Sequence, residues 1–227
     1  MKDLDLVVLD LDGTLYSSRA TTLGAVQRAV ADLNARHGLG LPQPTESEVL
    51  HGVGCTRGEF AERVFPALPR RYHDEIDALV WRWERTLIEE GRGSLFPGAR
   101  EALEAMRGDG ARLAVATNAG RPYMDTILDR FAIRGFFEEC RCAGDGGVRD
   151  KGDLIAAVVD SLGADARRSV MVGDRGSDVA GARKAGTRSI GCLWGFGSRA
   201  ELAGADALVE RFDEVPALAR EWPRGRR

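Results

Sequence analysis

Short, almost wholly apolar runs that alternate with helix-patterned segments constrain the fold of this chain more than any other feature. Runs of this length and composition are typical of strands that are buried on both faces of a parallel sheet. They lie at residues 4–11, 111–117, 168–173, 187–193 and 207–209. Between them, apolar residues recur with helical spacing at 97–107, 124–131, 154–162 and 178–185. Strands that alternate with helices predict an α/β fold with a parallel sheet.

The first two apolar runs are separated by about 100 residues, far more than the dozen or so of an ordinary crossover between parallel strands. Residues 15–95 contain no convincing strand, but they carry an apolar helical face at 23–33, a capping box at 45–48 and a long helical pattern at 72–90. We therefore predict a helical cap domain, residues 15–95, inserted into a core formed by residues 1–14 and 96–227.

Composition narrows the class of protein. The 227 residues include 32 basic and 35 acidic side chains, so no general basic surface for nucleic acid is expected. No apolar run approaches the length needed to span a bilayer, and acids interrupt the N-terminal run, which does not resemble a signal peptide. The four cysteines are too scattered for a disulfide framework. We expect a cytoplasmic protein without nucleic-acid or membrane partners, and its oligomeric state stays open.

Polar side chains follow three of the predicted strands. Taken singly, each could simply cap a helix or a turn. The carboxyl ends of parallel strands meet at one edge of the sheet, so we expect these side chains to converge there. Several carboxylates within a few ångströms repel one another, and a divalent cation removes that conflict. Oxygen ligands without histidine or cysteine favour Mg²⁺. The residues concerned are Asp10, Asp12, Gly13, Thr117, Asn118, Asp174 and Asp178, together with Lys151, which opens the helix before the third strand.

Asp10 and Asp12 are two residues apart in an extended segment, so their side chains point to the same side and can address one reacting centre. Asp10 could attack phosphorus as a carboxylate nucleophile, and Asp12 could exchange a proton with the leaving oxygen and then with water. Mg²⁺, the Thr117 hydroxyl and Lys151 would stabilise the charge of a phosphoryl transition state. Gly13 permits a sharp turn close to the phosphate.

This arrangement resembles the haloacid dehalogenase-like hydrolase superfamily over nearly the whole chain. Two longer segments, 95–120 and 173–202, look like the phosphoglycolate-phosphatase branch. The resemblance implies a Rossmann-like core and a helical cap after the first strand. The matching motifs, in the family's order, are DLDGTL (10–15), TN (117–118), Lys151 and GDRGSD (173–178).

The resemblance also implies roles for individual residues. Asp10 would be the nucleophile and Asp12 the acid and base. Mg²⁺ would be held by Asp10, the backbone carbonyl of Asp12 and Asp174, with Asp178 either a ligand or beside one. The implied activity is Mg²⁺-dependent hydrolysis of a small, phosphoglycolate-like phosphate ester through an aspartyl-phosphate. Two departures, Ser17 where many members have Asp and Gly152 where many have Pro, lie beside the motifs rather than in them.

Two alternatives stay open. A sugar phosphomutase of the β-phosphoglucomutase type has a similar cap, although its corresponding motifs differ from TN and GDRGSD. A non-catalytic binding protein could use the same scaffold. Phosphate release from p-nitrophenyl phosphate, with and without Mg²⁺, separates the hydrolase from both.

The cap offers one candidate for substrate specificity. The segment 51–57 is glycine-rich and is expected to form a loop above the sheet edge. Its arginine, Arg57, could pair with a carboxylate or a second phosphate of the substrate, while a solvated loop arginine is the simpler interpretation.

Overall fold

The computed structural model describes residues 4–55 and 57–221, without the side chains of Arg57 and Glu221. Its core is a six-stranded sheet in which every pairing is parallel, in the order β5-β4-β1-β6-β7-β8. The predicted α/β fold with a Rossmann-like parallel sheet is confirmed. Five strands fall within the predicted apolar runs: β1 (Leu6–Leu9), β4 (Arg112–Thr117), β6 (Ser169–Gly173), β7 (Arg188–Cys192) and β8 (Ala207–Val209).

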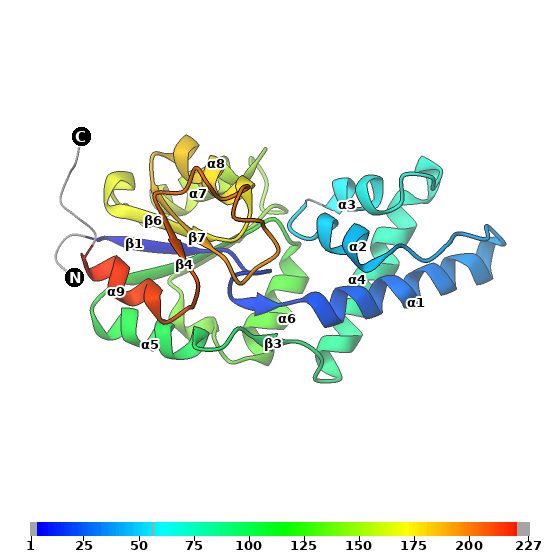
Figure 1. Ribbon diagram of the computed structural model, residues 1–227, viewed down its shortest axis with the longest axis horizontal. Coiled ribbons are helices and arrows are strands. Elements are labelled where there is room, and N and C mark those ends of the chain that lie inside the picture. Colours follow the sequence, from blue (N-terminus) through cyan, green and yellow to red (C-terminus); the bar gives the residue numbers. More distant parts are fainter. Residues whose placement is uncertain (1–3, 56, 222–227) are drawn as a thin grey trace.

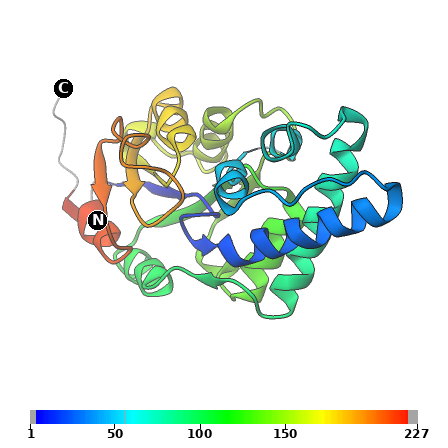
Figure 2. The same cartoon turned by 45° about the vertical axis from the view of Figure 1, so that its right-hand side comes forward.

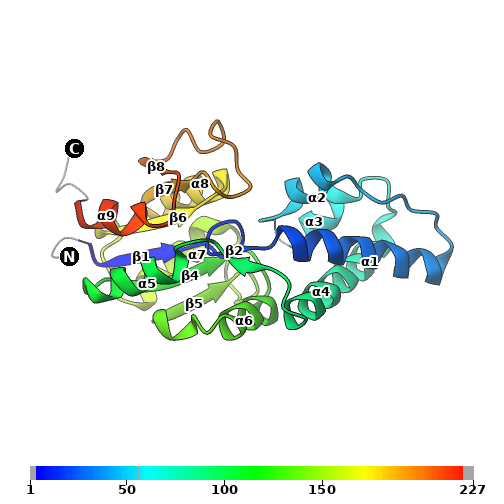
Figure 3. The same cartoon turned by 60° about the horizontal axis from the view of Figure 1, so that its bottom comes forward.

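Helices cover both faces of this sheet (Figures 1 and 3). Successive side chains of β1 point to opposite faces, and all four are fully buried, which explains why the run is continuously apolar. Val7 and Leu9 pack with α5 (Ala99–Gly108), α6 (Arg121–Arg130) and α9 (Glu214–Glu221). Leu6 and Val8 pack with α7 (Lys151–Ser161) and α8 (Gly176–Ala185). Short 3-10 turns, Arg134–Phe136 and Ala166–Arg168, complete the connections.

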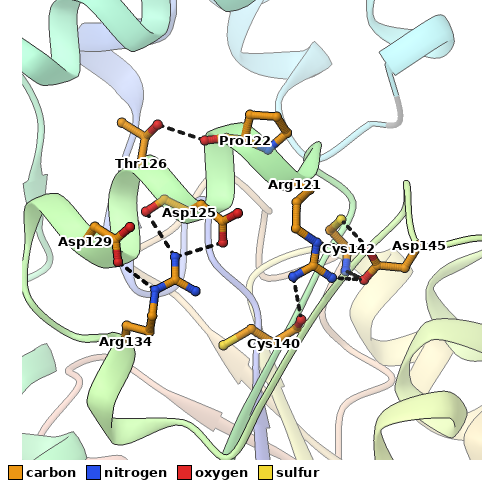
Figure 4. Close-up of polar contacts among 9 residues, drawn as sticks. All are labelled: Arg121, Pro122, Asp125, Thr126, Asp129, Arg134, Cys140, Cys142 and Asp145. Atoms are coloured by element: carbon orange, nitrogen blue, oxygen red, sulfur yellow. Dashed lines mark hydrogen bonds and ion pairs between the residues drawn. The ribbon is translucent and has the colours of Figure 1, made fainter.

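The edge strand β5 (Glu139–Cys142) was not predicted from the sequence. Charged residues alternate with its cysteines, and three of its four residues are only partly buried, so it lacks the apolar signature of the central strands. Polar contacts attach it to α6 (Figure 4). Arg121 donates to the Cys140 carbonyl at 3.2 Å and forms an ion pair with Asp145, which in turn accepts the Cys142 backbone N–H at 2.8 Å. Because the contacts of Arg121 join residues that are distant in the sequence, no local sequence pattern indicates the strand.

Residues between β1 and α5 form a helical lobe beside the sheet (Figures 1 and 2). Its helices share a hydrophobic cluster that is separate from the two clusters lining the sheet. The predicted capping box is present, with Thr45 as N-cap and Glu48 as its partner. In the described ranges, no helix is both long and apolar enough to cross a membrane. The elements of this lobe are α1 (Arg19–His37), α2 (Glu46–Gly52), α3 (Arg57–Val64), the 3-10 turn Arg70–Tyr72 and α4 (His73–Glu89).

Two expectations for this lobe are corrected. The segment is not purely helical, because β2 (Tyr16–Ser17) and β3 (Ser94–Leu95) form a small antiparallel ribbon where the chain leaves the core and returns. At Gly93, with φ +78°, any Cβ would lie 2.0 Å from the Tyr16 hydroxyl, so this crossing requires glycine. The expected loop at 51–57 is also shorter, because its first two residues end α2 and Arg57 begins α3.

Candidate active site

The side chains predicted to converge do meet at the carboxyl edge of the sheet. Asp10 follows β1, Thr117 ends β4, and Asp174 follows β6, while Lys151 is the first residue of α7. A small cavity of about 40 Å³ opens between them. Five predicted site residues line it: Asp10, Asp12, Thr117, Asn118 and Lys151. Gly54, Cys55, Ala119, Arg175 and Ser177 complete its wall.

Lys151 is the centre of a buried ion-pair network. Its Nζ lies 2.6 Å from Asp10 Oδ1 and 2.9 Å from Asp178 Oδ1, and all three side chains are at most 5% exposed. Burial lowers the pKa of Lys151, but the two carboxylates outweigh this effect and raise it above its usual value. Burial raises the pKa of Asp10 to about 7, even though Lys151 opposes the shift. The lysine therefore stays charged and holds Asp10 in place.

Asp174 is fully buried and is held by uncharged donors. Its Oδ1 accepts from the Thr14 hydroxyl at 3.1 Å, and its Oδ2 accepts from the Phe196 backbone N–H at 2.8 Å. Burial, with the nearby charges of Asp10 and Asp178, raises its pKa well above the ordinary value. Gly13, at φ +79°, makes room for this carboxylate, because a Cβ there would lie 2.2 Å from Asp174 Oδ2.

Oxygen atoms of Asp10, Asp174 and Asp178 all lie within 4.8 Å of one another. Lys151 supplies one positive charge to a group of three buried carboxylates, and Asp174 is paired only with neutral donors among the described residues. A hard divalent cation that prefers oxygen ligands fits this donor set. The residues present are therefore suited to Mg²⁺.

Asp12 is positioned by a residue that the sequence did not indicate. The hydroxyl of Tyr123, on α6, donates to Asp12 Oδ1 at 2.6 Å, and both side chains are buried. Burial raises the pKa of the Asp12 carboxyl, while the hydrogen bond from Tyr123 acts against that shift. The contact spans 111 residues of chain, so no local motif could have revealed it.

The turn between α2 and α3 brings the helical lobe to the small cavity. Asn118 Nδ2 donates to the Gly54 carbonyl at 2.9 Å, which joins the end of β4 to the turn between α2 and α3. Thr117 is buried, and its Oγ1 accepts the Ala119 N–H at 3.1 Å, which leaves the hydroxyl proton available to the cavity. Arg57 begins α3 nearby, but its side chain lies outside the described residues, and its contact with substrate stays a prediction.

A larger cavity of about 230 Å³ adjoins the small one. It lies between the lobe and the core, and five residues line both cavities: Asp12, Gly54, Cys55, Asn118 and Ala119. Glu84, on α4, faces the larger cavity and was not singled out from the sequence. Arg175 and Ser177 were also missed, although both stand inside the GDRGSD segment and could have been found there.

Comparison with known proteins agrees with this site. The family model described as "haloacid dehalogenase-like hydrolase" matches residues 4–186. A phosphoglycolate phosphatase of Cupriavidus necator is 34% identical, covering 93% of this chain and 91% of that protein. One from Caulobacter vibrioides is 30% identical, with 92% and 88% covered.

Comparison of the fold with solved structures supports the same family. A crystal structure described as a predicted phosphatase from Clostridium acetobutylicum superposes with a TM-score of 0.80 at 25% identity, covering 96% of this chain and 99% of that one. The resemblance stated from the motifs is thereby confirmed. The chain belongs to the haloacid dehalogenase-like hydrolase family and is a phosphatase of that family.

Proposed function

We propose that this protein is a Mg²⁺-dependent phosphomonoesterase that acts through an aspartyl-phosphate on Asp10, with a substrate comparable in size to phosphoglycolate. The observation that carries the proposal is the small cavity in which Asp10, Asp12 and Lys151 meet beside the buried carboxylates Asp174 and Asp178. This cavity, of about 40 Å³, has room for a small group such as a phosphoryl group.

In the first step, a carboxylate oxygen of Asp10 forms a bond to phosphorus while the bond from phosphorus to the leaving oxygen breaks. Asp12 gives its proton to that oxygen, and the alcohol departs. In the second step, Asp12 takes a proton from water, the water oxygen bonds to phosphorus, and the Asp10 carboxylate is restored. The charges of Lys151 and Arg175, which both line the cavity, stabilise the phosphoryl oxygens.

Asp10, Asp174 and Asp178, with the Asp12 carbonyl, are the groups we propose to hold Mg²⁺. When bound, the ion supplies further positive charge to the phosphoryl oxygens and relieves the repulsion among the carboxylates. Calcium should inhibit, because its looser and higher coordination permits bidentate binding by the Asp10 carboxylate and takes away its attacking geometry.

We also propose that residues 15–95 act as a cap over this site, with Arg57 as a candidate contact for the substrate. Two observations support a separate cap: this segment has its own hydrophobic cluster, and the Asn118–Gly54 hydrogen bond brings it to the site.

The test is phosphate release from p-nitrophenyl phosphate, measured with Mg²⁺, with Ca²⁺ and after exhaustive chelation. We expect activity with Mg²⁺ only, and acid quenching during turnover should trap one phosphate per chain in the wild type and none in Asp10→Asn. Full activity after chelation would contradict the metal assignment, and trapped phosphate in Asp10→Asn would contradict the nucleophile.

A further inference from the structure

The two adjoining cavities divide the site into parts with different chemistry. The smaller one contains the nucleophile and the cations Lys151 and Arg175. The larger one meets it at Asp12, which gives its proton to the leaving oxygen in the proposed mechanism. A phosphate ester bound with its phosphorus beside Asp10 can extend its alcohol portion past Asp12 into this larger cavity.

The volume of the larger cavity limits that alcohol. Its 230 Å³ leaves room for several water molecules, and so for a small organic group. A triose, a small polyol or an amino alcohol fits within this space. The apolar walls, from Phe60, Val80, Trp81 and Pro122, can pack against its carbon skeleton.

Glu84 is a polar residue of the cap that lines the larger cavity and can form a hydrogen bond to the alcohol portion of the substrate. Its Oε1 accepts a hydrogen bond of 2.7 Å from the hydroxyl of Thr22, which joins α4 to α1 and fixes the carboxyl group at the cavity wall. A carboxyl group has lone pairs for about four hydrogen bonds, so the Thr22 contact leaves acceptor capacity for a ligand. Burial raises the pKa of Glu84 to about 8, as expected for a carboxyl group removed from water.

We propose that Glu84 selects the substrate's alcohol portion, favouring one that carries a hydroxyl or an ammonium group over one that carries no hydrogen-bond donor. The proposal rests on the proposed function and narrows its substrate class. An alcohol portion without a donor would leave an acceptor of Glu84 unsatisfied at the cavity wall. A donor-bearing alcohol would instead satisfy the free oxygen of Glu84.

The experiment compares kcat/KM for four esters that differ in the alcohol. p-Nitrophenyl phosphate carries no donor, glycerol 2-phosphate carries hydroxyls, phosphoethanolamine carries an ammonium group, and 2-phosphoglycolate carries a carboxylate. The variants are Glu84→Met, which keeps the length of the side chain and removes its hydrogen bonds, and Glu84→Gln, which keeps hydrogen bonding and removes any charge. The matched control is Glu89→Met, an exposed glutamate on the same helix.

We expect Glu84→Met to lower kcat/KM for the donor-bearing ester by about tenfold, the loss typical of one buried hydrogen bond. Its kcat/KM for p-nitrophenyl phosphate should fall by much less, because that ester carries no donor for Glu84. Glu84→Gln separates the two donors, because an amide still bonds a hydroxyl but cannot neutralise an ammonium group. Glu89→Met should match the wild type on all four esters.

The proposal is overturned if Glu84→Met changes all four esters equally or none of them. Thr22→Val, on the other helix, provides an independent check, since it removes the hydroxyl that fixes Glu84 and should give the same pattern with a smaller loss. A wild type that releases no phosphate from any ester would contradict the proposed function instead, so the two failures are distinguishable.

Discussion

Replacing Asp174 by Asn should stabilise the metal-free protein while abolishing its activity. Asp174 is fully buried, its pKa is raised well above the ordinary value of 3.8, and its hydrogen-bond partners are uncharged. Asn keeps the shape of the side chain. Its carbonyl can accept the Phe196 N–H, and its amide can donate to Thr14 once that hydroxyl rotates. The substitution therefore removes a poorly compensated charge and keeps a hydrogen bond to each of the two partners.

The size of the effect follows from the cost of an inadequately solvated buried group, about 1–3 kcal/mol and more for a charged one. For a chain of this length, each kcal/mol shifts Tm by about 2–4 °C. We therefore expect Asp174→Asn to melt roughly 2–12 °C higher than the wild type in a chelating buffer near neutral pH.

The direction of the pH dependence provides a second measurement. The folded protein binds the Asp174 proton more tightly than the unfolded chain does, so its contribution to stability is complete below pH 3.8. That contribution is lost as the pH rises through the elevated pKa. In chelator, the Tm of the wild type should thus fall with rising pH more steeply than the Tm of Asp174→Asn.

Added Mg²⁺ should reverse the order of the two proteins. A ligand that binds only the folded state adds about 2.7 kcal/mol at one hundred times its Kd, and only the wild type retains the full set of ligands. Asp160→Asn, an exposed change on α7, is the control and should follow the wild type throughout. The reasoning is refuted if Asp174→Asn melts below the wild type in chelator, or if Mg²⁺ raises both Tm values equally.

Three further substitutions test the rest of the site. Asp12→Asn should slow turnover by about 10²–10⁴-fold, the usual contribution of general acid and base catalysis, and a smaller loss in steady-state assays would argue against that role. Tyr123→Phe removes the 2.6 Å hydrogen bond to Asp12 and should slow single-turnover cleavage of alkyl phosphates by about tenfold. It should have much less effect on p-nitrophenyl phosphate, whose leaving group needs little protonation; equal losses on both substrates would indicate only a structural contact. Lys151→Met leaves Asp10 and Asp178 buried without their cation and should destabilise the metal-free protein by about 3–5 kcal/mol in urea titrations, and an unchanged midpoint would disprove the ion-pair network.

The sequence by itself located most of the strands of the sheet core and brought the candidate site residues to one edge of it. Strands buried on both faces must be continuously apolar, so five of the six strands of the main sheet could be located from composition alone. Parallel strands end at one edge, so the acids that follow β1 and β6 had to come together wherever the intervening chain ran. Even the start of α2 was visible, because the Thr45 capping box involves only neighbouring residues.

The features that position the acid and surround the leaving group were decided only by tertiary structure. Tyr123 reaches Asp12 across 111 residues of chain, and Glu84 is joined to Thr22 across 62. Such contacts depend on how the lobe packs against the sheet, which no spacing rule encodes. The same applies to β5, whose backbone carbonyl at Cys140 and backbone N–H at Cys142 are hydrogen-bonded by Arg121 and Asp145. Local patterns determine which residues can carry the chemistry, whereas packing between distant segments determines which alcohol the cavity accommodates.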